Sequence, residues 1–131
     1  MNDAEFLTAF ENCTLTKADW THAAHVRMAW LYLSTDEPFE DVFARVREGI
    51  QRLNRTVLGK PEGYHETITY AFLRLILVRM RSDSPVTFTS FCVKHPELLS
   101  PGVLLAYYSK TLLESTHARQ NKVPPDLAPL P

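Results

Sequence analysis

The sequence contains little cysteine and little glycine, and each shortage excludes a class of protein. Its 131 residues include two cysteines, Cys13 and Cys92, without Cys-x-x-Cys spacing. This argues against a disulfide framework and fits a reducing compartment. Four glycines leave little for a phosphate-cradling loop, and the chain has no P-loop, dinucleotide-binding, Gly-x-Ser-x-Gly or His-Glu-x-x-His motif. Nucleotide-dependent chemistry of the familiar kinds is therefore disfavoured.

Long runs of one charge and long apolar runs are also missing. The formal net charge is −1 and no long basic run occurs, so we expect no nucleic-acid partner. Arg27, Arg74 and Arg79 interrupt the longest apolar stretches, so we expect no membrane span. Asp3 and Glu5 stand where a signal peptide would carry basic residues. These observations predict a cytoplasmic protein.

Helical periodicity is present over nearly the whole chain. Hydrophobic residues make up 45% and charged residues 22%, as in an ordinary globular domain. Four main helices are predicted at about 3–12, from between Thr16 and Thr21 to Leu33, from Pro38 to before Gly59, and at about 64–81. Shorter helices are predicted at about 88–95, from Ser100-Pro101 through Tyr108, and at about 110–120. A turn is expected at Ser82–Pro85, and only 86–89 hints at a strand.

These patterns predict an all-α fold, a single-domain helical bundle with four main helices and several short ones. The bundle is expected over residues 1–122, with an extended proline-rich tail over 123–131. Either Leu127 and Leu130 of the tail lie back on the bundle, or the end is disordered. Three aromatic residues are candidates for the face of a homodimer: Trp30, Tyr107 and Tyr108.

Two segments place histidine on otherwise apolar helix faces. Residues 20–25 read Trp-Thr-His-Ala-Ala-His, and at about 100° per residue His22 and His25 begin a buried stripe. Residues 64–67 read Tyr-His-Glu-Thr, and His65 falls in line with Ile68, Phe72 and Ile76. Glu66 lies at the margin of that stripe. Thr67, Arg74 and Arg81 are assigned to the opposite, solvated face.

Histidine and carboxylate side chains buried without partners cost about 1–3 kcal/mol or more, so these groups need partners. They satisfy one another most simply around a divalent metal ion, Zn or Fe. His22, His25 and His65 are predicted as the metal ligands, with Glu66 as the catalytic base; the exchange of roles between His65 and Glu66 is left open. A metal-free acid–base site and a structural hydrogen-bond network are the alternatives.

The predicted function is therefore that of a metal-dependent enzyme acting on a small molecule by hydrolytic or other Lewis-acid chemistry. An iron-dependent oxidation is also compatible with this ligand set. The alternative is a non-catalytic protein that binds a small ligand or a partner and whose His/Glu network is structural. His95, His117, Cys13 and Cys92 are expected to have no part in the site.

The two histidine segments and the closing Val-Pro-Pro-Asp-Leu-Ala-Pro-Leu-Pro resemble a group of small bacterial proteins without an assigned reaction. Those proteins share an aromatic-x-His-x-x-His pattern near the start, followed by Tyr-His-Glu-Thr-Ile-Thr. The resemblance spans residues 20–131. It implies that His22, His25, His65 and Glu66 are the characteristic residues, and it implies little about the reaction.

Overall fold

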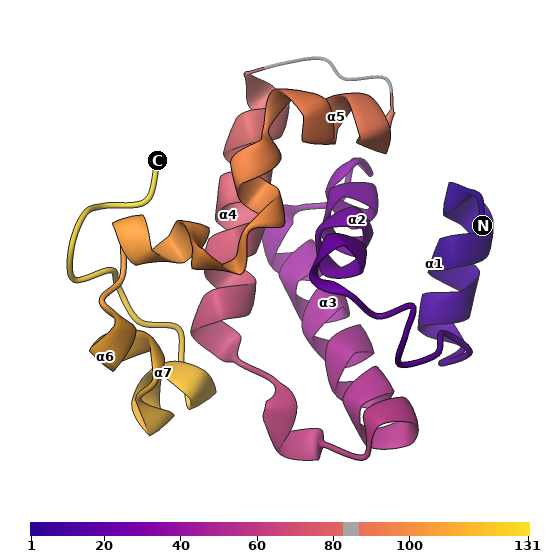
Figure 1. Cartoon of the computed structure of the whole chain (residues 1–131), viewed down its shortest axis with the longest axis horizontal. Helices are drawn as coiled ribbons and strands as arrows, with labels where there is room; N and C mark the ends of the chain where they lie inside the picture. Colours follow the sequence, from indigo (N-terminus) through magenta and orange to yellow (C-terminus); the bar gives the residue numbers. More distant parts are fainter. Residues whose placement is uncertain (83–86) are drawn as a thin grey trace. The chain divides into compact units, whose positions relative to one another are not determined.

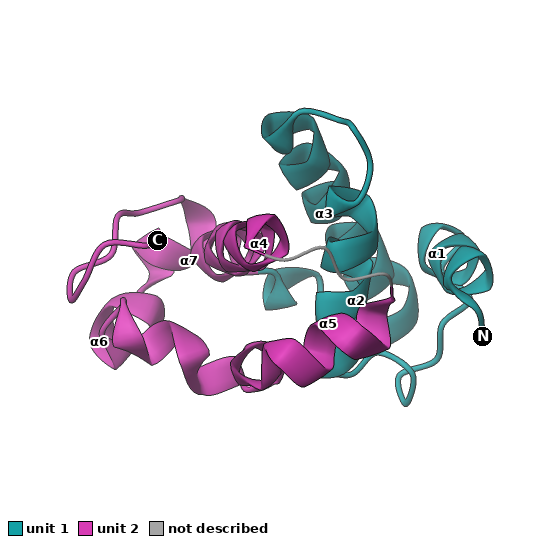
Figure 2. Ribbon diagram, turned by 90° about the horizontal axis from the view of Figure 1, so that it is seen from above, with its two compact units in different colours: residues 1–64 teal, residues 65–131 magenta. Residues whose placement is uncertain are grey.

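Helices account for all regular secondary structure in residues 1–82 and 87–131, the part of the chain that the computed structural model describes (Figure 1). The predicted all-α class is confirmed. The chain divides into two compact units, residues 1–64 and 65–131, which Figure 2 colours separately. The predicted boundary between residues 122 and 123 stays a prediction. Within the described residues, none of the helices is both long enough and apolar enough to cross a bilayer.

The first unit contains three of the four main helices. They are α1 (Asp3–Glu11), α2 (His22–Leu33) and α3 (Phe39–Leu53). A capping box between Asn2 and Glu5 starts α1, as expected for an Asn followed three residues later by Glu. The chain continues from α3 into the π-helix η1 (Asn54–Leu58) and ends it at Gly59, whose φ of 63° favours glycine. The short 3-10 helix η2 (Pro61–Gly63) follows.

The start of α2 lies at the late end of the predicted range of Thr16 to Thr21. Thr16 and Asp19 do exchange capping hydrogen bonds, because the Asp19 carboxylate accepts from the Thr16 backbone N–H at 3.1 Å and the Thr16 hydroxyl accepts from the Asp19 N–H at 3.2 Å. These bonds close a turn rather than a helix. The helix is capped by Thr21, whose hydroxyl accepts from the Ala24 N–H at 3.2 Å. The capping-box spacing of Thr16 and Asp19 therefore marks a turn before the helix, and Thr21 at the end of the predicted range is the cap.

The apolar faces of α1, α2 and α3 form the core of the first unit. The side chains of Phe6 and Phe10 from α1, Met28 from α2, and Val42 and Val46 from α3 are at most 3% exposed. On the outer side, Arg27 of α2 pairs with Asp3 at 2.8 Å, and its guanidinium lies 4.5 Å from the centre of the Phe6 ring. Trp30, considered for a dimer face, is buried.

The second unit is built on the longest helix, α4 (Glu66–Arg81). The remaining helices are α5 (Phe88–Lys94), the 3-10 helices η3 (Pro96–Leu99) and η4 (Pro101–Ala106), α6 (Lys110–Leu113) and α7 (Thr116–Gln120). Most of the turn expected at 82–85 lies outside the described residues, and so does Val86 of the suggested strand. Thr87 caps α5, so the described end of the suggested strand begins a helix instead.

Two of the shorter helices differ from the prediction in detail. The helix after Ser100 is a 3-10 helix, and Ser100 makes no side-chain cap bond. The segment expected as one helix at 110–120 is interrupted at Ser115, whose hydroxyl caps α7 by accepting from the Ala118 N–H at 3.1 Å. A serine that bonds the backbone locally ends one helix and begins the next, which periodicity does not reveal.

The proline-rich tail is held to the second unit by polar groups, whereas Leu127 stays exposed and Leu130 is half-buried. The Tyr108 hydroxyl donates to the Val123 carbonyl at 3.0 Å. The Asp126 carboxylate accepts from the Ser109 backbone N–H at 2.7 Å and from the Ser109 hydroxyl at 2.6 Å. Leu127 is 58% exposed, although its backbone N–H bonds the Tyr107 carbonyl at 2.9 Å. Tyr108, another candidate for a dimer face, is thus a buried anchor for the tail.

Candidate functional site

The first turn of α2 holds the histidine pair of the first unit. Both His22 and His25 are half-buried, one helical turn apart. The Nδ1 atom of His25 lies 2.7 Å from the backbone carbonyl oxygen of Thr21. Because a carbonyl oxygen only accepts, Nδ1 must carry the proton, and in the neutral ring Nε2 is then the lone-pair acceptor.

The surroundings of His25 favour its neutral form. Burial is the main cause that lowers the pKa of His25 below its ordinary value of 6.5, and the neighbouring His22 lowers it further, against the opposing effect of the bond to Thr21. The imidazole also packs against the Trp20 indole, with ring centres 3.8 Å apart and the planes tilted by 31°. A neutral imidazole fixed through Nδ1–H is the form that commonly binds a metal ion through Nε2.

Aromatic rings continue from His25 into the core of the first unit. Trp20 stacks on Phe10 with ring centres 5.3 Å apart, and Phe10 meets Tyr32 edge-to-face at 6.2 Å. Trp20 is 8% exposed, and its indole Nε1 is buried without a hydrogen-bond partner among the described residues. His25 therefore packs against a row of aromatic rings at the start of α2.

In the second unit, His65 is the N-cap of α4 rather than its first helical residue. Its Nδ1 accepts from the Ile68 backbone N–H at 3.1 Å, so the ring must be protonated on Nε2 when neutral. The Nε2–H then donates to the Leu113 carbonyl oxygen at 2.7 Å. Both ring nitrogens are therefore bonded to the backbone, which joins the start of α4 to the end of α6.

The electrostatic surroundings of His65 also favour the neutral ring. Burial lowers the pKa of His65, and the nearby Arg119 guanidinium lowers it too, while the bond to Leu113 works in the opposite direction. His65 is 8% exposed. In the conformation described, this histidine has no ring nitrogen left to bind a metal ion.

Thr67 lies on the buried face of α4, not on the solvated face that the helical wheel predicts, and it has a structural role there. The prediction placed it on the solvated face of α4, but it is 0% exposed. Its hydroxyl donates to the Asn121 carbonyl at 2.6 Å and accepts from the Val123 backbone N–H at 3.2 Å. The helical pattern does not reveal this contact, because the partners of Thr67 are backbone groups far along the chain. The only available signal was a threonine near the start of a helix, which is weak.

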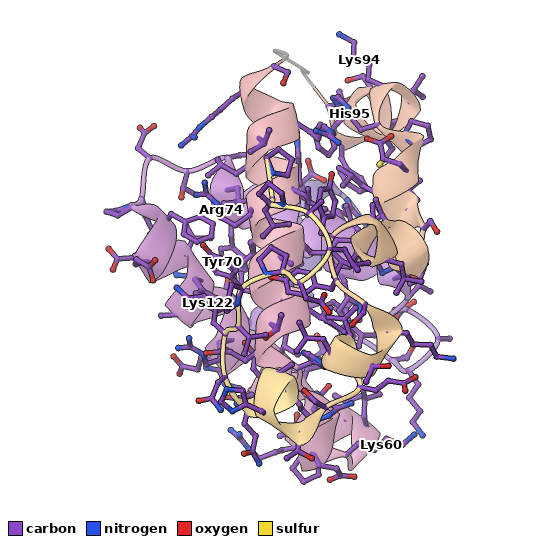
Figure 3. All side chains as sticks on the ribbon, turned by 90° about the vertical axis from the view of Figure 1, so that its left-hand side faces the viewer. Lys60, Tyr70, Arg74, Lys94, His95 and Lys122 are labelled. Carbon is purple, nitrogen blue, oxygen red and sulfur yellow. The ribbon has the colours of Figure 1, made fainter. Side chains whose placement is uncertain are left out.

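The solvent side of α4 carries a further contact to the tail. The Lys122 ammonium lies 4.5 Å from the centre of the Tyr70 ring, in a cation–π contact that Figure 3 shows on the face of α4. The Asp126–Ser109 bonds and this contact hold the two ends of the segment 122–126. The Tyr-His-Glu-Thr segment and the proline-rich tail therefore belong to one structural assembly in the second unit.

Glu66, predicted as the catalytic base, is the half-buried first residue of α4, where a carboxylate interacts favourably with the helix dipole. The four predicted site residues thus form two pairs, His22 with His25 in the first unit and His65 with Glu66 in the second. Across residues 1–82 and 87–131, no group of three or more His, Cys, Asp or Glu side chains is arranged to hold a metal ion.

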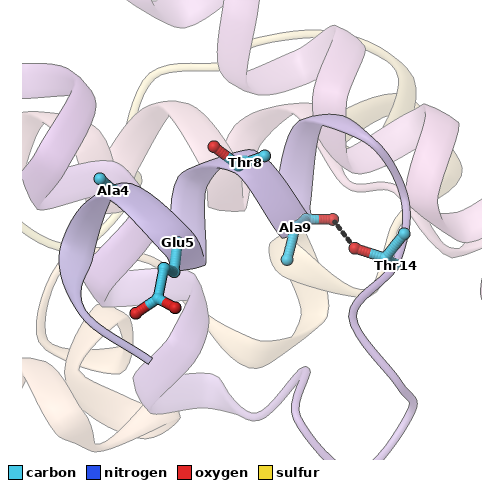
Figure 4. Close-up of a pocket in the computed structure, with 5 residues that line it drawn as sticks. All are labelled: Ala4, Glu5, Thr8, Ala9 and Thr14. Atoms are coloured by element: carbon cyan, nitrogen blue, oxygen red, sulfur yellow. Dashed lines mark hydrogen bonds between the residues drawn. The ribbon is translucent and has the colours of Figure 1, made fainter.

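A shallow pocket of about 350 Å³ lies along α1, and it offers little chemistry. Figure 4 shows the small and polar side chains that line it, with the Thr14 hydroxyl 3.4 Å from the Ala9 carbonyl. None of its residues was predicted as part of a site. Comparison of the chain with protein-family models, with curated proteins and with solved structures found no match.

Proposed function

We propose that the protein binds a divalent metal ion, Zn or Fe, through the imidazoles at the start of α2, and that the ion serves a hydrolytic or other Lewis-acid reaction on a small molecule. The observation that carries this proposal is the bond between His25 Nδ1–H and the Thr21 carbonyl at 2.7 Å. This bond leaves Nε2 as the lone-pair donor, in the manner usual for metal-binding histidines.

The second imidazole comes from His22, three residues earlier on the same helix. Side chains at this spacing have Cβ atoms about 5–6 Å apart, close enough to bind one ion. The lowered pKa of His25 supports the same role, since only the neutral ring binds a metal. An ion held by few protein ligands keeps open positions for water or substrate, and it would supply Lewis-acid activation of either one.

Metal content and metal-dependent stability test this proposal. Purified protein is expected to contain stoichiometric metal by elemental analysis and to gain thermal stability with added zinc or ferrous iron. His25→Gln and His22→Gln should each weaken binding by about tenfold or more. His117→Gln is the matched control, because His117 is an exposed histidine on α7 whose replacement should leave metal affinity unchanged.

The absence of stoichiometric metal, together with no thermal stabilisation by zinc, iron or manganese, would contradict the proposal. Equal loss of affinity in all three variants would also contradict it, because binding would then lack a specific site.

A second candidate function is that of a non-catalytic binding protein in which the buried histidine network is structural. The specific observation in its favour is that both ring nitrogens of His65 bond backbone groups, Ile68 N–H and Leu113 O. His65→Ala should destabilise the fold by about 2–3 kcal/mol, because it removes an N-cap and leaves a carbonyl unpaired. His65→Asn should recover about 1 kcal/mol of this, since asparagine is a good N-cap.

The measurement is urea unfolding of the three proteins with parallel metal analysis. A structural His65 leaves metal content unchanged in both variants. Loss of metal from folded His65→Asn protein would show that His65 is a ligand and would reject the structural role.

A further inference from the structure

A second pocket in the first unit is lined by aromatic and charged side chains. It lies beside the last turn of α2, about two turns from His25 and about three from His22, and has a volume of about 300 Å³. Its apolar wall is Phe10 of α1 and the ring of Tyr32 of α2. Its charged wall comes from Glu11 of α1 and from three residues of α3: Arg45, Glu48 and Arg52.

Tyr32 supplies a hydrogen-bond donor that the fold itself does not use. The residue is 4% exposed, and its hydroxyl makes no hydrogen bond to any residue in 1–82 or 87–131. Burial, followed by the nearby Glu11 carboxylate, raises the pKa of Tyr32 to about 12, although Arg45 and Arg52 act against this rise. The hydroxyl therefore keeps its proton at every physiological pH and can donate to a ligand in the pocket.

The charged wall presents both signs to a ligand. Arg52 pairs with Glu48 at 2.9 Å and also donates to the Glu11 backbone carbonyl at 3.3 Å. Arg45 pairs with Glu37 at 2.6 Å, and its guanidinium lies 5.6 Å from the centre of the Tyr32 ring. These pairs are partly exposed, and exposed ion pairs are weak, so they can exchange for a ligand at small cost.

Two arginines and two glutamates line the pocket, so its own charges balance. A multiply charged anion would gain from the guanidinium groups but would be repelled by Glu11 and Glu48. A molecule with one carboxylate and one ammonium group satisfies both signs at once. Its carboxylate would accept from the Tyr32 hydroxyl and an arginine, its ammonium would donate to a glutamate, and its apolar part would face the Phe10 ring.

We propose that this pocket between α1, α2 and α3 binds a small apolar amino acid in its zwitterionic form, with Tyr32, Arg45 and Arg52 recognising the carboxylate. The volume of about 300 Å³ is at the lower end of the range for ligand pockets and suits a molecule of this size. The site is distinct from the α2 histidine pair, so its test stands whether or not metal binds there.

Isothermal titration calorimetry on the full chain, with three matched probes, tests the ligand class. The probes are L-leucine, 4-methylpentanoate, which lacks the amino group, and 3-methylbutylamine, which lacks the carboxylate. L-Leucine should bind about tenfold or more tightly than either analogue, because each analogue leaves charged groups of the pocket unpaired. L-Methionine and L-phenylalanine are titrated alongside it.

Variants then test the residues. Tyr32→Phe removes only the hydroxyl and should weaken L-leucine binding about fivefold, whereas Arg52→Gln should weaken it about tenfold or more. Arg47→Gln is the control, because Arg47 lies on α3 with its guanidinium over the Phe43 ring, 4.6 Å from the ring centre, and does not line the pocket.

Three results would each overturn the proposal. The first is no saturable binding of any of the three amino acids at millimolar concentration. The second is equal affinity for L-leucine and for an analogue that lacks one charged group. The third is a loss of affinity in Arg47→Gln as large as that in Tyr32→Phe and Arg52→Gln.

Discussion

At Gly49, α3 packs directly against the Phe10 ring. A Cβ atom added there would lie 2.5 Å from two carbons of that ring, well inside any normal contact. Phe10 cannot move aside easily, because it is 1% exposed and stacks on Trp20. We therefore expect Gly49→Ala to destabilise the protein by about 1–2 kcal/mol, the cost of overpacking exceeding the gain in helix propensity.

Urea unfolding of Gly49→Ala against the wild type measures this effect. Gly102→Ala is the control, since a Cβ there would meet only the Ser100 hydroxyl oxygen at 3.7 Å. An equal or higher unfolding midpoint in Gly49→Ala would show that the Phe10 ring can move. Gly49→Ala should also weaken L-leucine binding in the pocket between α1, α2 and α3 (the Tyr32 pocket), because Phe10 and Gly49 both line it.

At the scale of the elements, the sequence predicted the main helices well because their apolar positions repeat at helical spacing. α1, α3 and the interior of α4 follow that repeat, and α4 ends at Arg81 as expected. Helix ends were predicted less well, because they depend on which side chain bonds which backbone group. For α2 the sequence offers two plausible caps: the capping box of Thr16 and Asp19, or Thr21 alone. Only the folded chain distinguishes them.

The candidate site was predictable to a lesser degree than the helices. The wheel placed His65 at the head of a buried stripe, and His65 is buried. It is also the N-cap of α4, bonded to Leu113 from a helix 48 residues away in sequence. Periodicity reports which side of a helix faces inward, but not which distant backbone group meets a side chain. For the same reason Thr67 was assigned to the wrong face, and the Tyr32 pocket was not predicted.

At the scale of the whole molecule, both units carry a histidine whose pKa is lowered, His25 in the first and His65 in the second. Burial is the main cause in each; the neighbouring His22 adds to it for His25, and the Arg119 guanidinium adds to it for His65. Each histidine binds a proton more readily in the unfolded chain than in the folded one. Their contribution to stability is therefore complete above the ordinary histidine pKa of 6.5.

As the pH falls below about 6.5, this contribution is lost progressively through the lower pKa of each folded histidine. Unfolding midpoints should therefore drop between roughly pH 7 and roughly pH 5, a range in which Asp19 and Asp126 stay ionised because their pKa values are lowered from 3.8.

Both tryptophans, Trp20 and Trp30, lie in the first unit, so their fluorescence reports that unit, whereas circular dichroism reports helices of both. His25→Gln should flatten the pH dependence seen by fluorescence, and His65→Asn should flatten the additional dependence seen by circular dichroism. An unchanged slope in both variants would show that other groups control acid stability, and an equal response of the two signals to either variant would show that the units unfold together.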